Sequence, residues 1–154
     1  RDDQDADSRR ICLVVSRESQ DAVTALRANA ALYQAIASGN MQAMDAVWAR
    51  DEPVLCIHPG GPPLQGRVAV MASWSEIFAG AAPPISYSQD SVSLVRGVAF
   101  VNCLEHLGET TLAASNVLVW ERGEWRLVLH SAGVMAPAKI KTTPPPGNPT
   151  GRLH

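Results

Sequence analysis

ISYSQDSVSLVRGVAFVNCLEHLGETTLAASNVLVWERGEWRLVLHSAGV, which spans residues 85–134, decides the fold of this chain. Valine, leucine, threonine and aromatic residues are frequent in it, and short turn signals interrupt it at Arg96-Gly97, Gly108-Glu109 and Arg122-Gly123. Strand-like runs separated by two residues that include glycine are typical of β-hairpins. The run therefore predicts four antiparallel strands, over Ile85–Val95, Val98–Leu107, Thr110–Glu121 and Glu124–Val134.

Helical periodicity precedes these strands. Apolar residues recur every three or four positions between Asp21 and the Gly39-Asn40 pair, which predicts an amphipathic helix that ends at this pair. A shorter helix is expected over residues 41–49. A third helix is expected from Gly66 to about Phe78, because apolar side chains again recur on one side.

One further strand and two terminal arms complete the predicted organisation. Residues 54–58 form a β-rich run that ends at a cluster of prolines and glycines. Helices followed by a strand meander predict an α+β domain in which the helices cover one face of the sheet. We expect an N-terminal arm over residues 1–20, one domain over residues 21–136, and a proline-rich C-terminal arm over residues 137–154.

Charge and hydropathy give no reason to expect nucleic acid or a membrane as a partner. The chain of 154 residues has a formal net charge of −2, and its arginines are scattered rather than gathered in a stripe. This pattern favours neither nucleic acid nor an anionic membrane surface as a partner. The longest early apolar run, residues 11–15, is far shorter than the ~20 residues that a membrane-spanning helix needs.

The number and spacing of the cysteines bear on the cellular compartment of the protein. Cys12, Cys56 and Cys103 lie far apart, without the CxxC spacing of metal or redox motifs. An odd number of cysteines, two of them inside apolar runs, favours buried free thiols in a reducing compartment. We therefore expect a cytoplasmic protein.

Two stretches resemble the NTF2-like superfamily, which includes SnoaL-like cyclases, ketosteroid isomerase and small dehydratases. The first is WARDEPVLCIHPGGPPLQGR, residues 48–67, followed by Ser73-Trp74. The second is the predicted last hairpin, with residues 117–120, 123–127 and His130-Ser131. The resemblance covers residues 22–135 and implies a cone-shaped α+β fold, with three N-terminal helices packed on a curved, mostly antiparallel sheet.

The resemblance also implies partners. Proteins of this type enclose an apolar pocket between the concave face of the sheet and the helices, and many form homodimers through the outer face. We therefore expect an apolar small molecule in the pocket and a second copy of the chain on the sheet. Nothing in the resemblance or in the motifs calls for a cofactor.

Comparison with ketosteroid isomerase suggests roles for single residues. It places His58 at the position of the catalytic base, and imidazole can move protons near neutral pH. Asn116 falls near the acid that polarises the substrate oxygen, a task that an amide N–H can also perform. The family's tyrosine position falls on Leu32, with Tyr33 about 100° away around the helix, so steroid isomerisation is not expected. Alternatively, His58 only ends its strand and binds the following loop.

Strand alternation extends the candidate site. If the strand faces that carry Asn102, Asn116 and His130 all point inward, the pocket holds amides and imidazoles among apolar walls, as small-molecule sites do. In the alternative, these groups line a wet dimer interface, which for His106 is an equally good interpretation. Trp48 and Trp74 contact either the ligand or only the core. The predicted ligand contacts are Tyr33, Trp48, Trp74, Asn102, His106 and Leu118.

Two other groupings bear on the site and its supports. His58, His106 and His130 would suffice as zinc ligands, but none of them lies at local chelating spacing, so no metal site is expected. Trp120 and Trp125 flank a predicted turn, and we expect them to stack as a cross-strand pair that stabilises the hairpin.

The sequence supports two functions. The first is small-molecule binding, with or without catalysis; a catalyst would be a cofactor-independent hydratase, dehydratase, isomerase or cyclase in which His58 moves the proton and Asn116 and His130 polarise oxygen. The alternative is a non-catalytic dimerisation or association module of the same fold. The sequence identifies neither the ligand nor whether a reaction occurs, because function depends on the site rather than on the fold.

Overall fold

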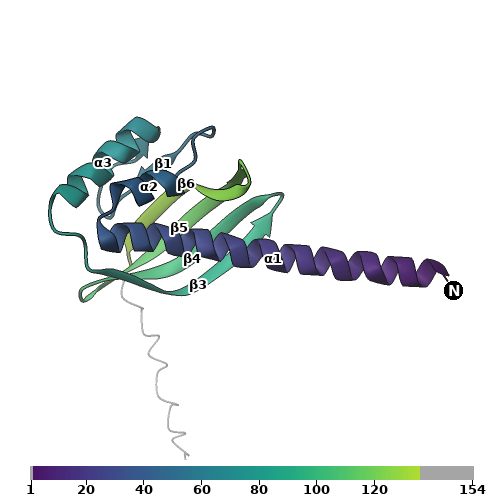
Figure 1. Ribbon diagram of the computed structural model, residues 1–154. Coiled ribbons are helices and arrows are strands. Elements are labelled where there is room, and N and C mark those ends of the chain that lie inside the picture. Colours follow the sequence, from purple (N-terminus) through teal and green to yellow (C-terminus); the bar gives the residue numbers. More distant parts are fainter. Residues whose placement is uncertain (1, 136–154) are drawn as a thin grey trace, which may run out of the picture.

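The computed structural model describes residues 2–135, with side chains from residue 17 onward. Three helices lie on one face of a strongly twisted six-stranded sheet (Figure 1). None of these helices is both long and apolar enough to span a bilayer. In chain order the elements are α1 (Asp2–Ser38), α2 (Met41–Val47), β1 (Leu55–Ile57), β2 (Leu64–Gln65), α3 (Arg67–Ala79), β3 (Ile85–Val95), β4 (Val98–Leu107), β5 (Thr110–Glu121) and β6 (Glu124–Val134).

The sheet has the strand order β2-β1-β6-β5-β4-β3, in which β1 runs parallel to β6 and the other neighbours are antiparallel. The four long strands have the predicted bounds. Arg96 and Gly97 have φ angles of 51° and 79°, and Arg122 and Gly123 have 52° and 86°. Two consecutive positive φ angles are the geometry of the tight hairpin turns that match strand twist. The α+β prediction and its hairpins are confirmed.

Helix α1 begins at Asp2, so the helix start predicted at Asp21 is wrong. Residues 2–20 contain neither glycine nor proline, and their arginine, glutamate and alanine residues are good helix formers. Apolar periodicity marks only the part of a helix that packs on something, and here Leu32 and Ile36 are buried against the sheet. The first half of α1 runs beyond the sheet in Figure 1. The predicted C-terminal arm lies outside the described residues.

Strand β2 was not predicted. It pairs antiparallel with β1, so the proline and glycine cluster of residues 59–63 connects a short hairpin. Two residues carry too little alternation to be recognised as a strand in the sequence. Gly66, with a φ of 84°, then turns the chain into α3.

Two packing predictions concern the thiols and the tryptophan pair. Cys56 and Cys103 are buried free thiols, as expected, while the side chain of Cys12 lies outside the described residues. The Trp120 and Trp125 rings lie 5.5 Å apart at 81°, which confirms the cross-strand pair. This edge-to-face geometry is the arrangement that aromatic quadrupoles favour.

Arg67 ties the start of α3 to the end of α2. Its Nη1 donates to the carbonyl oxygens of Trp48 (3.1 Å) and Ala49 (2.9 Å). Its Nη2 donates to the Asp45 carbonyl oxygen (2.7 Å) and to the Asp45 carboxylate (2.6 Å). A planar guanidinium satisfies all four acceptors at once, which an ammonium group cannot do. This contact holds the chain where it leaves α2 for β1.

We expect Arg67→Lys to lower the free energy of unfolding by about 1–3 kcal/mol, because the charge remains while carbonyl oxygens at the end of α2 lose their donors. Urea denaturation followed by circular dichroism measures the loss. Arg27→Lys, on the exposed side of α1, is the matched control and should change the stability by less than about 0.5 kcal/mol. Equal stability of both variants would contradict the role given to Arg67.

Candidate functional site

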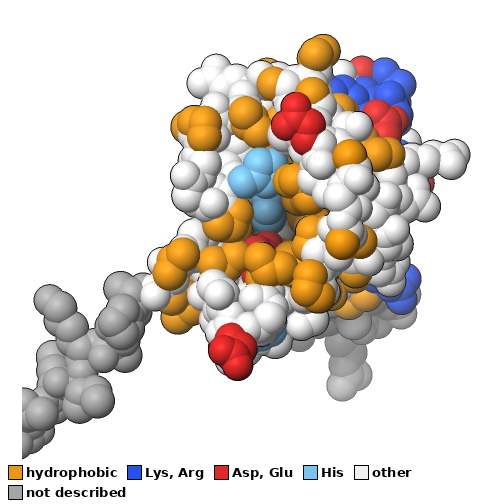
Figure 2. All heavy atoms as spheres, turned by 90° about the vertical axis from the view of Figure 1, so that its left-hand side faces the viewer, with side chains coloured by type: hydrophobic (Ala, Val, Ile, Leu, Met, Phe, Trp, Pro, Cys, Tyr) orange, Lys and Arg blue, Asp and Glu red, His pale blue; other side chains and the backbone are white. Residues whose placement is uncertain are grey.

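A cavity of about 220 Å³ opens between the concave face of the sheet and helix α3. Figure 2 looks into this hollow, which hydrophobic side chains surround and which contains histidine and acidic groups. Its titratable groups are His58, Glu105 and His130. Its other walls are Ile36, Pro59, Trp74, Ile77, Pro83, Ile85, Leu107 and Leu112.

Three different elements supply the titratable groups. His58 directly follows β1, Glu105 lies on β4 and His130 lies on β6. Strand alternation turns Val101, Cys103 and Glu105 of β4 inward, and all three side chains are buried. Glu105 was missing from the sequence prediction. Its position two residues after Cys103, in an apolar run, was the signal that could have found it.

His58 contacts Ser73 through one ring nitrogen, and Cys56 Sγ lies beside the ring, 3.8 Å from Nε2 and 4.0 Å from Nδ1. Its Nε2 lies 2.9 Å from Ser73 Oγ, and this hydroxyl donates its single hydrogen to the Val70 carbonyl oxygen (3.0 Å). His58 Nε2 therefore donates to Ser73, and Nδ1 carries the lone pair. Burial lowers the pKa of His58, which favours the neutral ring. Trp74 packs edge-on against this ring, with centroids 4.8 Å apart.

The Asn116 amide orients His130. Its Nδ2 donates to Asn29 Oδ1 (2.7 Å) and to Tyr33 Oη (3.1 Å), so its two N–H groups are both used. Its Oδ1 lies 2.7 Å from His130 Nδ1, which must therefore donate. The lone pair of His130 is then on Nε2, and this atom lies 3.8 Å from Glu105 Oε1.

Glu105 lies at the meeting point of this network and the cavity. Tyr33 Oη donates to Glu105 Oε1 (2.8 Å), and Cys103 Sγ lies 3.1 Å from Tyr33 Oη. Burial raises the pKa of Glu105, and the Tyr33 hydrogen bond only partly offsets it. Burial also lowers the pKa of His130 to about 4, with a further contribution from His58. The carboxyl group therefore has no cationic imidazole beside it near neutral pH to offset the effect of burial, which disfavours its charged form.

Several predicted site residues lie together. His58, Trp74 and His130 line the cavity. Asn116 does not line it, and with both N–H groups engaged it has no donor for a substrate oxygen, so the predicted polarising role does not fit. Tyr33, expected to be turned away from the family's tyrosine position, has its hydroxyl in the network behind Glu105.

Other residues predicted to contact a ligand do not line this cavity. Trp48 is fully buried in the core, where its Nε1 donates to Met44 Sδ, and Leu118 is also a core residue. Asn102 and His106 lie on the outer face, bonded to Ser115 and Ser88. The cause is the strand register.

The register between β4 and β5 separates the two amides. Asn116 pairs with Val101, whereas Asn102 pairs with Ser115. Residues that pair across neighbouring strands share a face, so Asn102 and Asn116 point to opposite sides of the sheet. The prediction assumes that both point inward, and the register rules this out.

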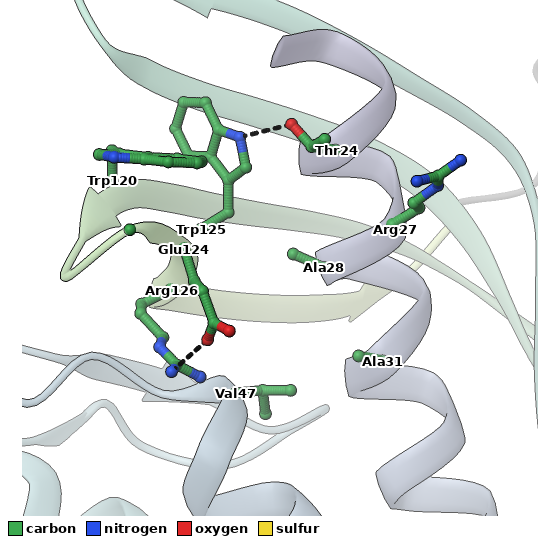
Figure 3. A pocket seen from close by; sticks show the side chains of 10 residues that line it. Thr24, Arg27, Ala28, Ala31, Val47, Trp120, Glu124, Trp125 and Arg126 are labelled. Atoms are coloured by element: carbon green, nitrogen blue, oxygen red, sulfur yellow. Dashed lines mark hydrogen bonds and ion pairs between the residues drawn. The ribbon is translucent and has the colours of Figure 1, made fainter. Parts of the chain in front are cut away.

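A larger hollow of about 360 Å³ lies between α1, α2 and the β5–β6 turn (Figure 3). In it, Trp125 Nε1 donates to Thr24 Oγ1 (3.1 Å), and Arg126 forms an ion pair with Glu124. It holds no buried titratable group. Because the smaller cavity combines apolar walls with a buried carboxyl group and two imidazoles, it is the candidate site.

No group of three or more His, Cys, Asp or Glu side chains is placed to hold a metal ion within the part of the chain whose side chains are described. The polar groups of the residues that line the cavity are the Glu105 carboxyl group, two imidazoles and the indole N–H of Trp74, which has no partner among the described residues. Such groups can act as acids, as bases and as hydrogen-bonding partners.

Comparison with known proteins identifies the family. Residues 25–137 match the model of the SnoaL-like domain. The chain is a member of the SnoaL-like domain family. No curated protein sequence matches it at a significant level.

Solved structures of NTF2-like proteins resemble this SnoaL-like domain. A proposed dehydratase of the NTF2-like family from Streptomyces avermitilis shares 26% identity over 78% of this chain and 99% of its own, with a TM-score of 0.72. A proposed calcium/calmodulin-dependent protein kinase type II association domain from Thiobacillus denitrificans shares 32% identity over 71% and 93%, with a TM-score of 0.57. The CaMKII hub of S. rosetta, at 20% identity over 74% and 96%, has a TM-score of 0.60 and shares the fold.

We expect His130 to make this SnoaL-like domain lose about 3 kcal/mol of unfolding free energy between pH 7 and pH 4. The folded protein holds the ring uncharged down to a pKa of about 4, whereas the unfolded chain protonates it near 6.5. The stability present above pH 6.5 is thus lost as the pH falls. Glu105 has the opposite effect on the unfolding free energy: because its pKa is raised in the folded protein, it adds stability as the pH falls.

The measurement is urea denaturation at pH 7, 5.5 and 4 of the natural chain and of His130→Asn. The variant keeps a donor for Asn116 but has no group that titrates in this range. Since Glu105 is present in both proteins, the difference between their pH profiles isolates His130. Parallel profiles would show that the ring is not held uncharged.

Proposed function

We propose that this SnoaL-like domain binds a small carbonyl compound and catalyses proton transfer on it without a cofactor, as a lyase or isomerase. One observation carries the proposal: the Glu105 carboxyl group and two uncharged imidazoles line one apolar cavity. Groups with shifted pKa values in an apolar pocket are characteristic of acid–base sites.

In the proposed reaction, His58 is the base. Its Nδ1 lone pair accepts a proton from the carbon next to the substrate carbonyl, and the electron pair of that C–H bond shifts towards the carbonyl oxygen. Glu105, whose raised pKa enlarges its protonated fraction, donates a hydrogen bond in that form to this oxygen as it gains charge, among apolar walls. Return of the proton to another carbon gives an isomer. Departure of a β-hydroxyl group as water, with that proton, gives a dehydration.

The network behind the cavity holds the acid in place. Tyr33 fixes Glu105 Oε1 at 2.8 Å, and Asn116 fixes the ring of His130. We propose that Asn116 and Tyr33 are positioning residues that do not touch the substrate, and that His130 accepts a hydrogen bond through Nε2. In this proposal Glu105, and not Asn116 as the sequence suggested, polarises the substrate oxygen.

Hydrogen–deuterium exchange tests the chemistry without knowledge of the natural substrate. We expect the protein to accelerate exchange of the α-hydrogens of cyclohexanone or acetophenone in D₂O at least tenfold over buffer, as followed by proton NMR. His58→Ala and Glu105→Gln should each bring this rate down to that of buffer, because a general acid or base usually contributes about a hundredfold or more.

His106→Ala is the matched control, because this imidazole lies on the outer face of the sheet and should leave the exchange rate unchanged. Circular dichroism and thermal melting of each variant establish that it is folded. A folded His58→Ala variant that exchanges as fast as the natural chain would overturn the proposal.

Self-association is a second candidate function. Phe100, Val117 and Leu129 pair across β4, β5 and β6 on the outer face, and Leu55 continues the row on β1. Phe100 is 42% exposed. The relative that shares 32% identity is described as an association domain, which favours a role in assembly for this face. We propose a homodimer through the sheet, in the cytoplasm, where Cys56 and Cys103 would stay reduced.

Light scattering coupled to size-exclusion chromatography tests the interface. We expect a dimer for the natural chain and a monomer for Phe100→Arg, because an unpaired guanidinium in the apolar row disfavours association. Val68→Arg, at an 88% exposed position of α3 away from the sheet, should remain a dimer. A natural chain that runs as a monomer at 50 μM would contradict the proposed dimer.

A further inference from the structure

We infer that the cavity takes a neutral carbonyl compound no larger than one six-membered ring with a short substituent, and that it excludes carboxylates and fused-ring compounds. The inference rests on the proposed function in that both concern the same cavity. It narrows the ligand class by size, by charge and by the position of the polar groups.

Size sets the upper limit. The cavity has a volume of about 220 Å³. An apolar cavity of about 150 Å³ is sufficient for benzene, whereas pockets for drug-sized molecules begin at about 300 Å³. The space beside Glu105 therefore suits a single ring that carries two or three further heavy atoms. Walls from the sheet, such as buried Leu112, cannot retreat without disturbing the close-packed core.

Charge sets the second limit. None of the residues that line the cavity is lysine or arginine. A carboxylate or phosphate inside it would face the Glu105 carboxyl group without a permanent counter-ion. Burying an unpaired anion costs several kcal/mol, which a ligand of this size cannot recover from its few apolar contacts.

The arrangement of polar groups sets the third limit. Glu105 Oε1 and His130 Nε2 lie 3.8 Å apart. The Trp74 ring, whose indole N–H has no partner in the described part of the chain, lies 6.0 Å from the ring of His130 and 4.8 Å from that of His58, so the polar groups of the wall are neighbours. Aliphatic residues such as Ile77 and Ile85 supply other parts of the wall. A ligand that matches this distribution has a single hydrogen-bonding end and a hydrocarbon remainder, as an aryl or cycloalkyl ketone has.

Three probes separate these limits: acetophenone, benzoate and 2-acetonaphthone. Acetophenone and benzoate share the ring but differ in charge, and 2-acetonaphthone adds a second ring to the same ketone. We expect saturation-transfer NMR and calorimetry at pH 7 to detect acetophenone with a millimolar or lower Kd. Benzoate should bind at least tenfold more weakly, and 2-acetonaphthone should not bind inside the cavity.

A variant pair locates the binding. Ile77→Trp fills the cavity from α3 and should abolish acetophenone binding, whereas Val68→Trp, exposed on the same helix, should leave it unchanged. Leu107→Trp, at the 38% exposed rim, repeats the test if Ile77→Trp melts at a lower temperature than the natural chain. Binding that survives both substitutions would place acetophenone elsewhere and overturn the inference.

The remaining outcomes each decide one claim. Benzoate that binds as tightly as acetophenone overturns the charge limit, and 2-acetonaphthone binding that Ile77→Trp abolishes overturns the size limit. No detectable binding of acetophenone at 10 mM overturns the ligand class. Acetophenone that binds without α-hydrogen exchange supports the ligand class while removing the catalytic proposal, so the two failures are distinguishable.

Discussion

The buried amide of Asn116 is the constraint on which the site depends. It is fully buried, so each of its polar atoms must find a partner inside the protein. Those partners come from α1, through Asn29 and Tyr33, and from β6, through His130. The amide therefore fixes the distance between helix and sheet, and at the same time the tautomer of a cavity residue. A hydrocarbon at this position would leave several donors and acceptors without partners.

The same burial determines the chemistry of the cavity. An apolar wall disfavours charge, so the pKa of Glu105 moves up and that of His130 moves down to about 4. Exposed groups of the same types would be a charged carboxylate and a partly charged imidazole, each surrounded by water. Low polarity around fixed hydrogen bonds is thus what separates the pKa values of these cavity groups from those of exposed ones.

Sequence patterns predicted the sheet well because turns are local. Two consecutive residues with positive φ form the turn between two strands, and in the sequence an Arg-Gly pair marks such a turn. Periodicity failed for the first half of α1, since no apolar face is required where a helix leaves the sheet. For the site, alternation divides a strand into two faces without saying which one is inside. That choice depends on register with a neighbour, which placed Glu105 inside and Asn102 and His106 outside.

One alternating sequence gives β4 and β5 two faces with different surroundings. Glu105 and Asn116 point into the cone, while Phe100 and Val117 point away from it. A substitution at an outward position changes the outer surface of the sheet and leaves the cavity wall in place. A substitution at an inward position changes the cavity wall and leaves the outer surface in place. Within the family fold, an association surface and a ligand cavity therefore do not compete for the same side chains. The chain resembles both a proposed dehydratase and an association domain, and this separation of the two faces is compatible with both similarities.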